Sequence, residues 1–115
     1  MKLFSYSSCS TCRRAIKWLN RFDFTFELFD ILNTPPSRQM LVSACEQYGD
    51  RKYLLNTSGL IYRSIGSKVI KNMSDKELFE KLFIEPRLIK RPFLFKPNNS
   101  FLVGFKEEKW AEELL

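Results

Sequence analysis

The distribution of apolar residues in the first 31 positions constrains the fold of this chain more than any other feature. Residues 2–6, KLFSY, form a short apolar run that predicts a buried strand. The next segment has helical spacing, with apolar residues three and four apart at Cys12, Ala15, Ile16, Leu19 and Phe22. Residues 24–31, FTFELFDI, are rich in aromatic and β-branched residues and predict a second strand. A helix that connects two neighbouring strands implies that these strands run parallel.

The middle of the chain has the pattern of a helical segment. The sequence NTPPS predicts a helix start, with Thr34 as the N-cap and Pro35 in the first turn. On that helix, four residues are predicted to share one face: Leu41, Ala44, Cys45 and Tyr48. Cys45 is therefore expected to be a core residue rather than a third redox thiol. The sequence NTSG at 56–59 predicts a turn or a helix start, and SDKE at 74–77 matches a capping box.

The end of the chain predicts a hairpin and a final helix. The runs FLFK at 93–96 and FLVGF at 101–105 flank the turn formers Pro-Asn-Asn-Ser. In the closing helix, four residues are expected to face inward: Trp110, Ala111, Leu114 and Leu115. The predicted order is β-α-β, a helical middle, then β-β-α. This order is typical of an α/β thioredoxin-like fold with a helical insertion at about 33–90, and we expect residues 1–115 to be one domain.

Cys9 and Cys12, in the stretch SCSTCRR, lie at the predicted junction between the first strand and the first helix. A Cys-x-x-Cys pair serves either as half of a zinc site or as a dithiol redox pair. The chain has three cysteines and no histidine, so a closed zinc site would need a carboxylate as its fourth ligand, which is uncommon. We therefore expect no metal. Two incidental cysteines, one of them packed in the core, remain the alternative, but the strand-to-helix junction favours a redox pair.

A cysteine at a helix N-terminus is expected to be acidic. Unpaired backbone N–H groups and the helix dipole favour a thiolate there, so the pKa of Cys9 is predicted to lie below the free value of about 8.5. Arg13 and Arg14 add positive charge nearby. Cys12, one turn into the helix, is predicted to be more buried. Cys9 is thus expected to be the attacking thiol and Cys12 the resolving thiol.

The charge and hydropathy patterns argue against several classes of function. The net charge of +6 suits an anionic substrate, glutathione or an acidic partner. The basic residues are scattered and form no block of like charges, so we expect no direct binding to nucleic acid. No run approaches the roughly 18 apolar residues of a membrane helix, and the N-terminus lacks the pattern of a signal peptide. We therefore expect a cytoplasmic protein without a membrane segment, in a compartment where disulfides are usually transient.

Longer motifs across the chain resemble one known family. The carrying stretches are CSTCRRAIKWL, TPPSRQML, LLNTSGLIYRSIG, SDKELFEKLFIEPRLIKRPFLF and LVGFKEEKW. In this order they are similar to the ArsC/Spx/YffB-like family, the arsenate reductase-related branch of the thioredoxin/glutaredoxin superfamily. The resemblance implies a four-stranded mixed sheet with flanking helices, and a cis Arg91–Pro92 bond that faces the cysteines. It also implies that Cys9 is the redox cysteine and that Arg91 helps to bind an oxyanion or to hold a thiolate.

The sequence departs from the glutathione-linked arsenate reductases of this family at three places. Those enzymes use one redox cysteine, whereas here Cys12 supplies a second. They carry an arginine where this chain has Asn56, and another after the final hairpin, where this chain has LVGFKEE. Arg63 is a candidate replacement, although a surface position is the simpler interpretation. These losses weigh against arsenate as the substrate.

Three functions remain open under this resemblance. The first is a thiol–disulfide oxidoreductase that acts on glutathione-linked or protein disulfides. The residues expected for it are Cys9, Cys12 and Arg91 for catalysis and Arg13, Arg63 and Pro92 for substrate binding. The alternatives are an Spx-like redox-controlled regulator that binds the RNA polymerase α subunit, and an arsenate reductase. We expect a monomer without a cofactor, with glutathione, glutaredoxin or thioredoxin as the electron donor.

Overall fold

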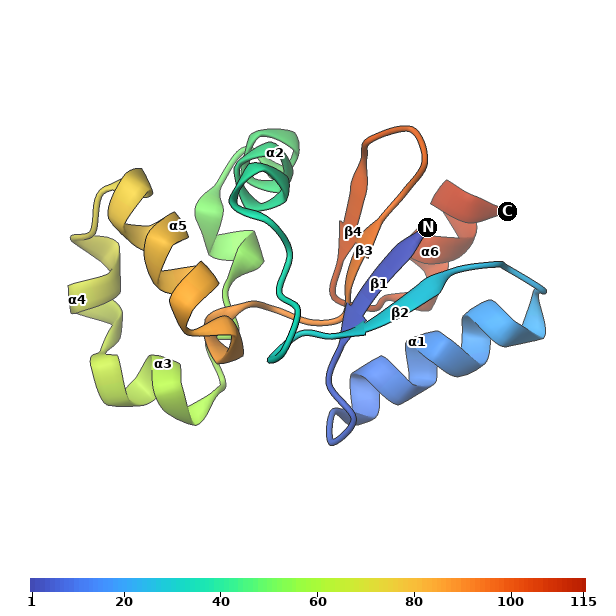
Figure 1. The fold of residues 1–115 in the computed structure, drawn as a ribbon, viewed down its shortest axis with the longest axis horizontal. Helices are drawn as coiled ribbons and strands as arrows, with labels where there is room; N and C mark the ends of the chain where they lie inside the picture. The colour runs from blue at the N-terminus through green and yellow to red at the C-terminus, as the bar shows by residue number, and fades with distance from the viewer.

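The computed structural model describes residues 1–115, and its elements follow the order predicted from the sequence (Figure 1). The elements are β1 (Lys2–Ser5), α1 (Ser10–Arg21), β2 (Glu27–Asp30), α2 (Arg38–Tyr48), η1 (Arg51–Leu54), α3 (Leu60–Ile65), α4 (Ser67–Lys71), α5 (Asp75–Ile84), η2 (Pro86–Leu88), β3 (Phe93–Phe95), β4 (Phe101–Val103) and α6 (Glu107–Leu114). Both η segments are short 3-10 helices. The helical insertion therefore runs from α2 to η2, between the second and third strands.

The four strands form one mixed sheet in the order β2-β1-β3-β4. Strand β1 pairs with β2 in parallel and with β3 antiparallel, and β3 pairs antiparallel with β4. Helix α1 supplies the crossover that the parallel pair requires. The expected α/β thioredoxin-like fold with a four-stranded mixed sheet is confirmed.

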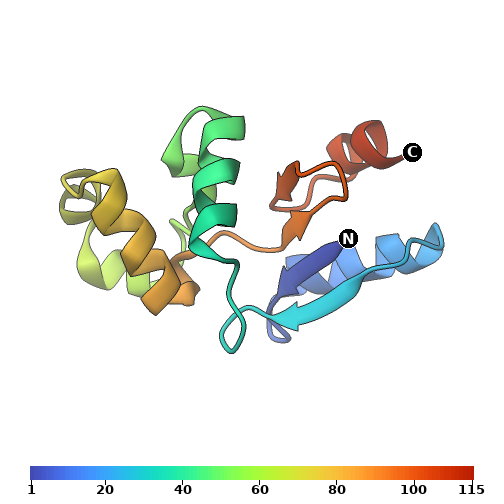
Figure 2. The same ribbon diagram turned by 45° about the horizontal axis from the view of Figure 1, so that its top comes forward.

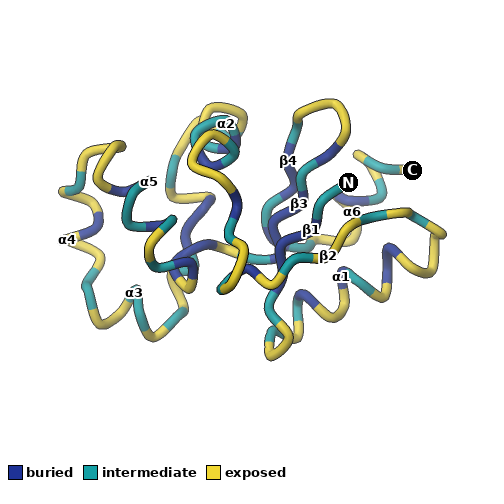
Figure 3. The backbone as a smooth tube through the Cα atoms, in the orientation of Figure 1, coloured by how far each residue is buried: buried dark blue, intermediate teal, exposed yellow.

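Alternate side chains of the strands leave the sheet on opposite faces and enter two separate clusters. The smaller cluster lies beneath α1 and α6 and contains Leu3, Ala15, Trp18, Leu19, Leu94, Leu102 and Trp110. The larger cluster joins the other face to the insertion, and its sheet residues include Phe4, Phe93 and Phe101. Figure 3 shows the buried stretches gathered in the central strands, between the two groups of helices. The sheet is thus covered on both faces.

Helix α2 lies between the rest of the insertion and the β3–β4 hairpin (Figures 1 and 2). The Gln47 side chain accepts a hydrogen bond from Phe101 N (2.7 Å) and donates one to Phe101 O (2.8 Å). The Tyr48 hydroxyl accepts a hydrogen bond from Val103 N (2.9 Å). Strand β4 is an edge strand, so these contacts satisfy backbone groups that would otherwise lack partners in the sheet.

The start of α2 differs from the prediction that Thr34 caps it. Ser37 is the N-cap, and its side chain accepts a hydrogen bond from Met40 N (3.1 Å). A residue before proline is disfavoured in the α region. Thr34 and Pro35 both precede a proline, so the helix starts only after Pro36. Thr34 N instead donates to Asp30 O (2.8 Å) in the turn that follows β2.

Two apolar residues of the predicted helices are exposed: Phe22, one of the helically spaced apolar positions, and Leu115, which was predicted to face inward. Phe22 is 38% exposed, whereas Trp18, which lies off the predicted apolar stripe, is only 5% exposed. The reason is that α1 ends at Arg21, so Phe22 is its C-cap and no longer follows the helical periodicity. Leu115 is exposed because α6 ends at Leu114. Helix periodicity predicts burial only within the helix.

The other predicted local signals have clear counterparts. Ser74 and Glu77 form the predicted capping box at the start of α5. Glu77 N donates a hydrogen bond to the Ser74 hydroxyl (3.1 Å), and Ser74 N donates one to the Glu77 carboxylate (3.2 Å). NTSG at 56–59 is a turn that leads into α3. Cys45 packs against the larger cluster but is only half-buried, because it lies at the margin of the α2 face that carries Leu41 and Ala44.

Candidate redox site and the cleft beside it

Cys9 lies at the N-cap of α1, and Cys12 lies one turn into the helix. The backbone of Cys9 is extended (φ −89°, ψ 114°), and its Sγ accepts a hydrogen bond from Cys12 N at 3.2 Å. The Cys9 N–H donates to Tyr6 O at 3.0 Å, which anchors the loop between β1 and the helix. Cys9 is half-buried, Cys12 is fully buried, and all three cysteines are thiols. Cys9 is therefore the more accessible of the two thiols and Cys12 the more buried, as predicted from the sequence.

The two thiols differ in acidity. Burial raises the pKa of Cys9, but hydrogen bonds from Cys12 and the positive charge of Arg91 outweigh burial and leave that pKa below its ordinary value. Burial, reinforced by the bond to Cys9, raises the pKa of Cys12 to about 12. Burial also raises the pKa of Cys45, with the carboxylates of Asp75 and Asp50 adding to the effect. Of the three cysteines, Cys9 therefore forms its thiolate at the lowest pH.

Arg91 supplies the cation that acts on Cys9. It precedes Pro92 through a cis peptide bond at the start of β3, as the family resemblance implied. Its guanidinium stacks over the Tyr6 ring, 5.2 Å from the ring centroid, and Nη1 contacts Arg87 O at 3.4 Å. Pro92 itself is buried. Tyr6 therefore contacts both partners of the thiolate site: its carbonyl holds the Cys9 backbone, and its ring holds Arg91.

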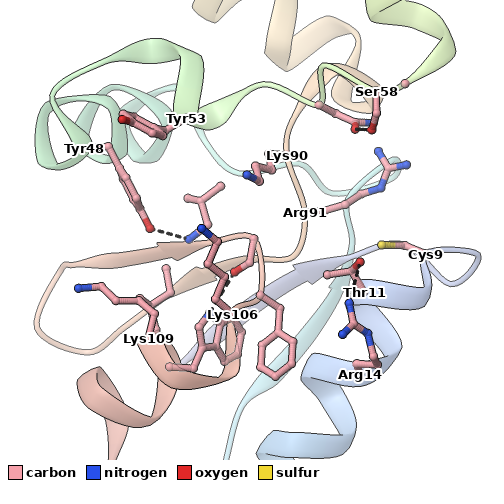
Figure 4. A pocket seen from close by; sticks show the side chains of 17 residues that line it. Cys9, Thr11, Arg14, Tyr48, Tyr53, Ser58, Lys90, Arg91, Lys106 and Lys109 are labelled. Carbon is pink, nitrogen blue, oxygen red and sulfur yellow. Dashed lines mark hydrogen bonds between the residues drawn. The ribbon is translucent and has the colours of Figure 1, made fainter.

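Cys9 opens into a cleft of about 760 Å³, which we call the basic cleft (Figure 4). The start of α1, the segment around η1, the residues before β3, and the segment from β4 into α6 line it. Its lining contains five cationic side chains and no carboxylate; the cations are Arg14, Lys90, Arg91, Lys106 and Lys109. Only Lys109 is in an ion pair, with Glu113 at 3.1 Å. Four of the five cleft cations therefore have no carboxylate partner.

The other residues predicted to bind substrate lie elsewhere. Arg13 donates to Ser7 O at 2.7 Å and does not line the cleft, and its neighbour Arg14 lines it instead. Arg63 donates to Ser58 O at 3.0 Å and lies outside the lining as well. Pro92 is covered by its surroundings and shapes the backbone rather than the cleft surface.

Several residues that line the cleft were not predicted as site residues from the sequence. Lys90 adjoins Arg91 in the LIKRPFL motif, so that motif contained a signal for it. Lys106 and Lys109 are three apart in KEEKW, a spacing that places them on one side of a helix start but does not say what they face. Asn56 also lines the cleft, and its amide contacts Arg87 O at 3.4 Å.

The structure has no cluster of three or more histidine, cysteine, aspartate or glutamate side chains that could hold a metal ion. None of its helices combines the length and the apolar character that crossing a membrane requires.

The family model of the ArsC family matches residues 4–113 of this chain. The chain belongs to the ArsC family. The chain is 37% identical to the protein YusI of Bacillus subtilis over 97% of this chain and 96% of YusI. It is 29% identical to the "Global transcriptional regulator Spx" of Streptococcus mutans, over 93% of this chain and 77% of that protein. The structure of "a possible arsenate reductase from Streptococcus mutans UA159" superposes with a TM-score of 0.85 at 31% identity, over 96% of both chains.

Proposed function

We propose that this ArsC-family protein is a thiol–disulfide oxidoreductase that reduces glutathione-linked or protein disulfides. The observation that carries the proposal is the opposite acidity of two thiols one helical turn apart. The pKa of Cys9 is lowered, although burial opposes this, by the bonds from Cys12 and by Arg91, while burial raises the pKa of Cys12 to about 12. A half-buried thiol with a lowered pKa, beside a buried thiol with a raised pKa, suits the two steps of disulfide exchange.

The chemistry balances within the pair. The Cys9 thiolate attacks one sulfur of the substrate disulfide, forms a Cys9–substrate disulfide and releases the other sulfur as a thiolate. The Cys12 thiol then gives up its proton, attacks Cys9 Sγ, and displaces the second substrate sulfur, which takes up the proton. Two electrons pass to the substrate, and the protein retains a Cys9–Cys12 disulfide. An external thiol reductant, such as glutathione, glutaredoxin or thioredoxin, returns the pair to the dithiol form.

Replacing each cysteine separately tests this function. Cys9→Ser is expected to reduce a glutathione mixed disulfide no faster than an equal concentration of a free thiol, because the nucleophile is absent. Cys12→Ser is expected to accumulate the Cys9–substrate disulfide, visible as an added mass. Cys45→Ser serves as the matched control and is expected to retain wild-type turnover. Full activity in Cys9→Ser would contradict the proposal.

A regulatory role is the second candidate, because the relative Spx is described as a global transcriptional regulator. Under this role, the Cys9–Cys12 pair would be a switch, and the dithiol and disulfide forms would bind the RNA polymerase α subunit with different affinities. Binding measurements on reduced and oxidised protein separate the two roles in one preparation. Arsenate reduction has less support, since Asn56 supplies no charge to the cleft and Arg63 lies outside it.

A further inference from the structure

The end of the basic cleft away from Cys9 forms a surface that disulfide exchange by itself does not use. Figure 4 shows Cys9 and Arg91 at one end, and Tyr48, Lys106 and Lys109 at the other. Lys90 lies between the two ends. A ligand that reaches from Cys9 to the lysines must therefore cross the middle of the cleft.

One of the two lysines at this far end has no carboxylate partner. Lys106 has no carboxylate within 4.0 Å, and Lys109 shares the exposed Glu113 with Lys96. Glu107 and Glu108 lie between the two lysines in the sequence, but neither lines the cleft. Cations that face one cleft without carboxylates raise its positive potential, which favours anionic groups.

The walls at the far end are aromatic and partly fixed. The Tyr48 hydroxyl accepts a hydrogen bond from Val103 N at 2.9 Å, and the Tyr53 ring lies 5.9 Å from the Tyr48 ring, tilted by 36°. Tyr53 remains 45% exposed, so its ring can receive an apolar side chain. Aromatic rings provide contact area at a low cost in conformational entropy. This combination suits a peptide with acidic and apolar side chains better than a small inorganic anion.

We propose that the far end of the basic cleft, formed by Tyr48, Tyr53, Lys106 and Lys109, binds an acidic segment of a protein whose disulfide lies at Cys9. The inference rests on the proposed oxidoreductase function and narrows its substrate class to disulfides flanked by aspartate or glutamate. An extended peptide advances about 3.3–3.6 Å per residue, so a few residues beside the cysteine carry the acidic side chains along the cleft. The exchange step is unchanged; the lysines contribute to substrate binding.

Two peptides that differ only in charge test this proposal. Each carries one cysteine in a mixed disulfide with a coloured aryl thiol, flanked by glutamates in one peptide and by glutamines in the other. Wild-type protein is expected to reduce the glutamate peptide with a kcat/KM about five- to tenfold higher, because two exposed charge pairs contribute a few-fold each. Added salt is expected to reduce this preference.

The matched variants are Lys106→Ala/Lys109→Ala and Lys68→Ala/Lys71→Ala. Both remove two positive charges three residues apart, but Lys68 and Lys71 are exposed on α4 and outside the cleft. The first variant is expected to lose the preference for the glutamate peptide, and the second to keep it. Measurable reduction of both peptides with equal kcat/KM in the wild-type protein overturns the proposal, as does an equal loss of the preference in both variants.

A binding measurement separates this inference from the proposed function. The Cys9→Ser variant is mixed with each fluorescent peptide in its reduced form, and binding is followed by anisotropy. Selective binding of the glutamate peptide, lost in the Lys106→Ala/Lys109→Ala background, supports the subsite even if the wild-type protein reduces neither peptide, which would refute only the oxidoreductase function. Equal binding of both peptides, or equally tight binding of a short oligothymidylate, overturns the acidic-peptide assignment.

Discussion

Cys9 combines groups from two distant parts of the chain. The backbone N–H of Cys12 comes from its own helix, while the Arg91 guanidinium comes from the start of β3, beyond the insertion. The Tyr6 carbonyl accepts a hydrogen bond from Cys9 N, and the Tyr6 ring lies beneath the Arg91 guanidinium. Because burial works against the thiolate, the lowered pKa depends on both groups remaining in place.

Removing the guanidinium is expected to shift the reactivity of Cys9 to higher pH. Alkylation follows the thiolate, so a lowered pKa places the midpoint of the rate below that of an ordinary thiol. In Arg91→Met, burial still raises the pKa of Cys9, while one of the opposing interactions is lost, so the midpoint rises. Iodoacetamide labelling across a pH series, read by mass spectrometry, measures this shift.

Arg13→Met is the control, since it removes an equal charge from the helix that carries Cys9 but Arg13 does not line the cleft. Its midpoint is expected to stay at the wild-type value. A larger shift in Arg13→Met than in Arg91→Met would show that Arg13, and not Arg91, lowers the pKa of Cys9. Cys12, with its pKa raised by burial to about 12, is expected to stay unlabelled near neutral pH.

The sequence predicted the positions of Cys9 and Cys12 because these positions depend on local structure. A strand end, a helix start and a spacing of three residues suffice to place Cys9 at the helix N-terminus and Cys12 inside the helix. The basic cleft is not local: Tyr48, Lys90 and Lys106 meet only because the insertion folds back over the hairpin. No periodicity along the chain indicates that distant residues line one cleft. The sequence therefore predicts substrate binding by Arg13 and not by Arg14, whereas Arg14 lines the cleft and Arg13 does not.

Of the two α2 side chains that hold the hairpin, Gln47 both donates and accepts a hydrogen bond. Gln47→Ala is expected to destabilise the protein by about 1–2 kcal/mol, because Phe101 N–H and C=O on the edge strand lose their partners. Urea unfolding measures the change. Gln39→Ala, which removes only an exposed contact to Ser43 on the same helix, is expected to stay within about 0.5 kcal/mol of wild type. Equal losses of unfolding free energy in both variants would mean that the Gln47 contact with strand β4 does not stabilise the protein.

Helices and strands that have a clear sequence pattern of their own were predictable, and short helices that depend on tertiary packing were not. The strand–helix–strand start, the capping box of α5 and the hairpin each follow from a few neighbouring residues. Residues 49–73 form a 3-10 helix and two short helices, α3 and α4, that meet at Gly66 with φ +96°. Helices this short are marginal without tertiary packing, so the sequence alone carries little trace of them.

The two core clusters share the sheet, and this arrangement couples the two groups of helices. Residues that alternate along β1, β3 and β4 belong to opposite clusters, so neither cluster survives without the same three strands. The insertion has no sheet of its own. We therefore expect the chain to unfold as one unit.

This expectation can be checked with two probes that report on different clusters. Both tryptophans, Trp18 and Trp110, lie in the smaller cluster, while most helices lie in the insertion beside the larger one. Tryptophan fluorescence and far-UV circular dichroism are expected to give the same urea midpoint. An earlier transition by circular dichroism would show that the insertion unfolds before the sheet.

The contacts of α2 with β4 also bear on misassembly. Strand edges with free backbone groups can recruit other chains, and this sheet has two edges. One edge is closed by Gln47 and Tyr48, while the other, β2, carries the exposed charges of Glu27 and Asp30. A fibre that grew by adding strands would have to detach α2 at one edge or bring like charges together at the other. The helix that borders the basic cleft is therefore also a barrier to aggregation.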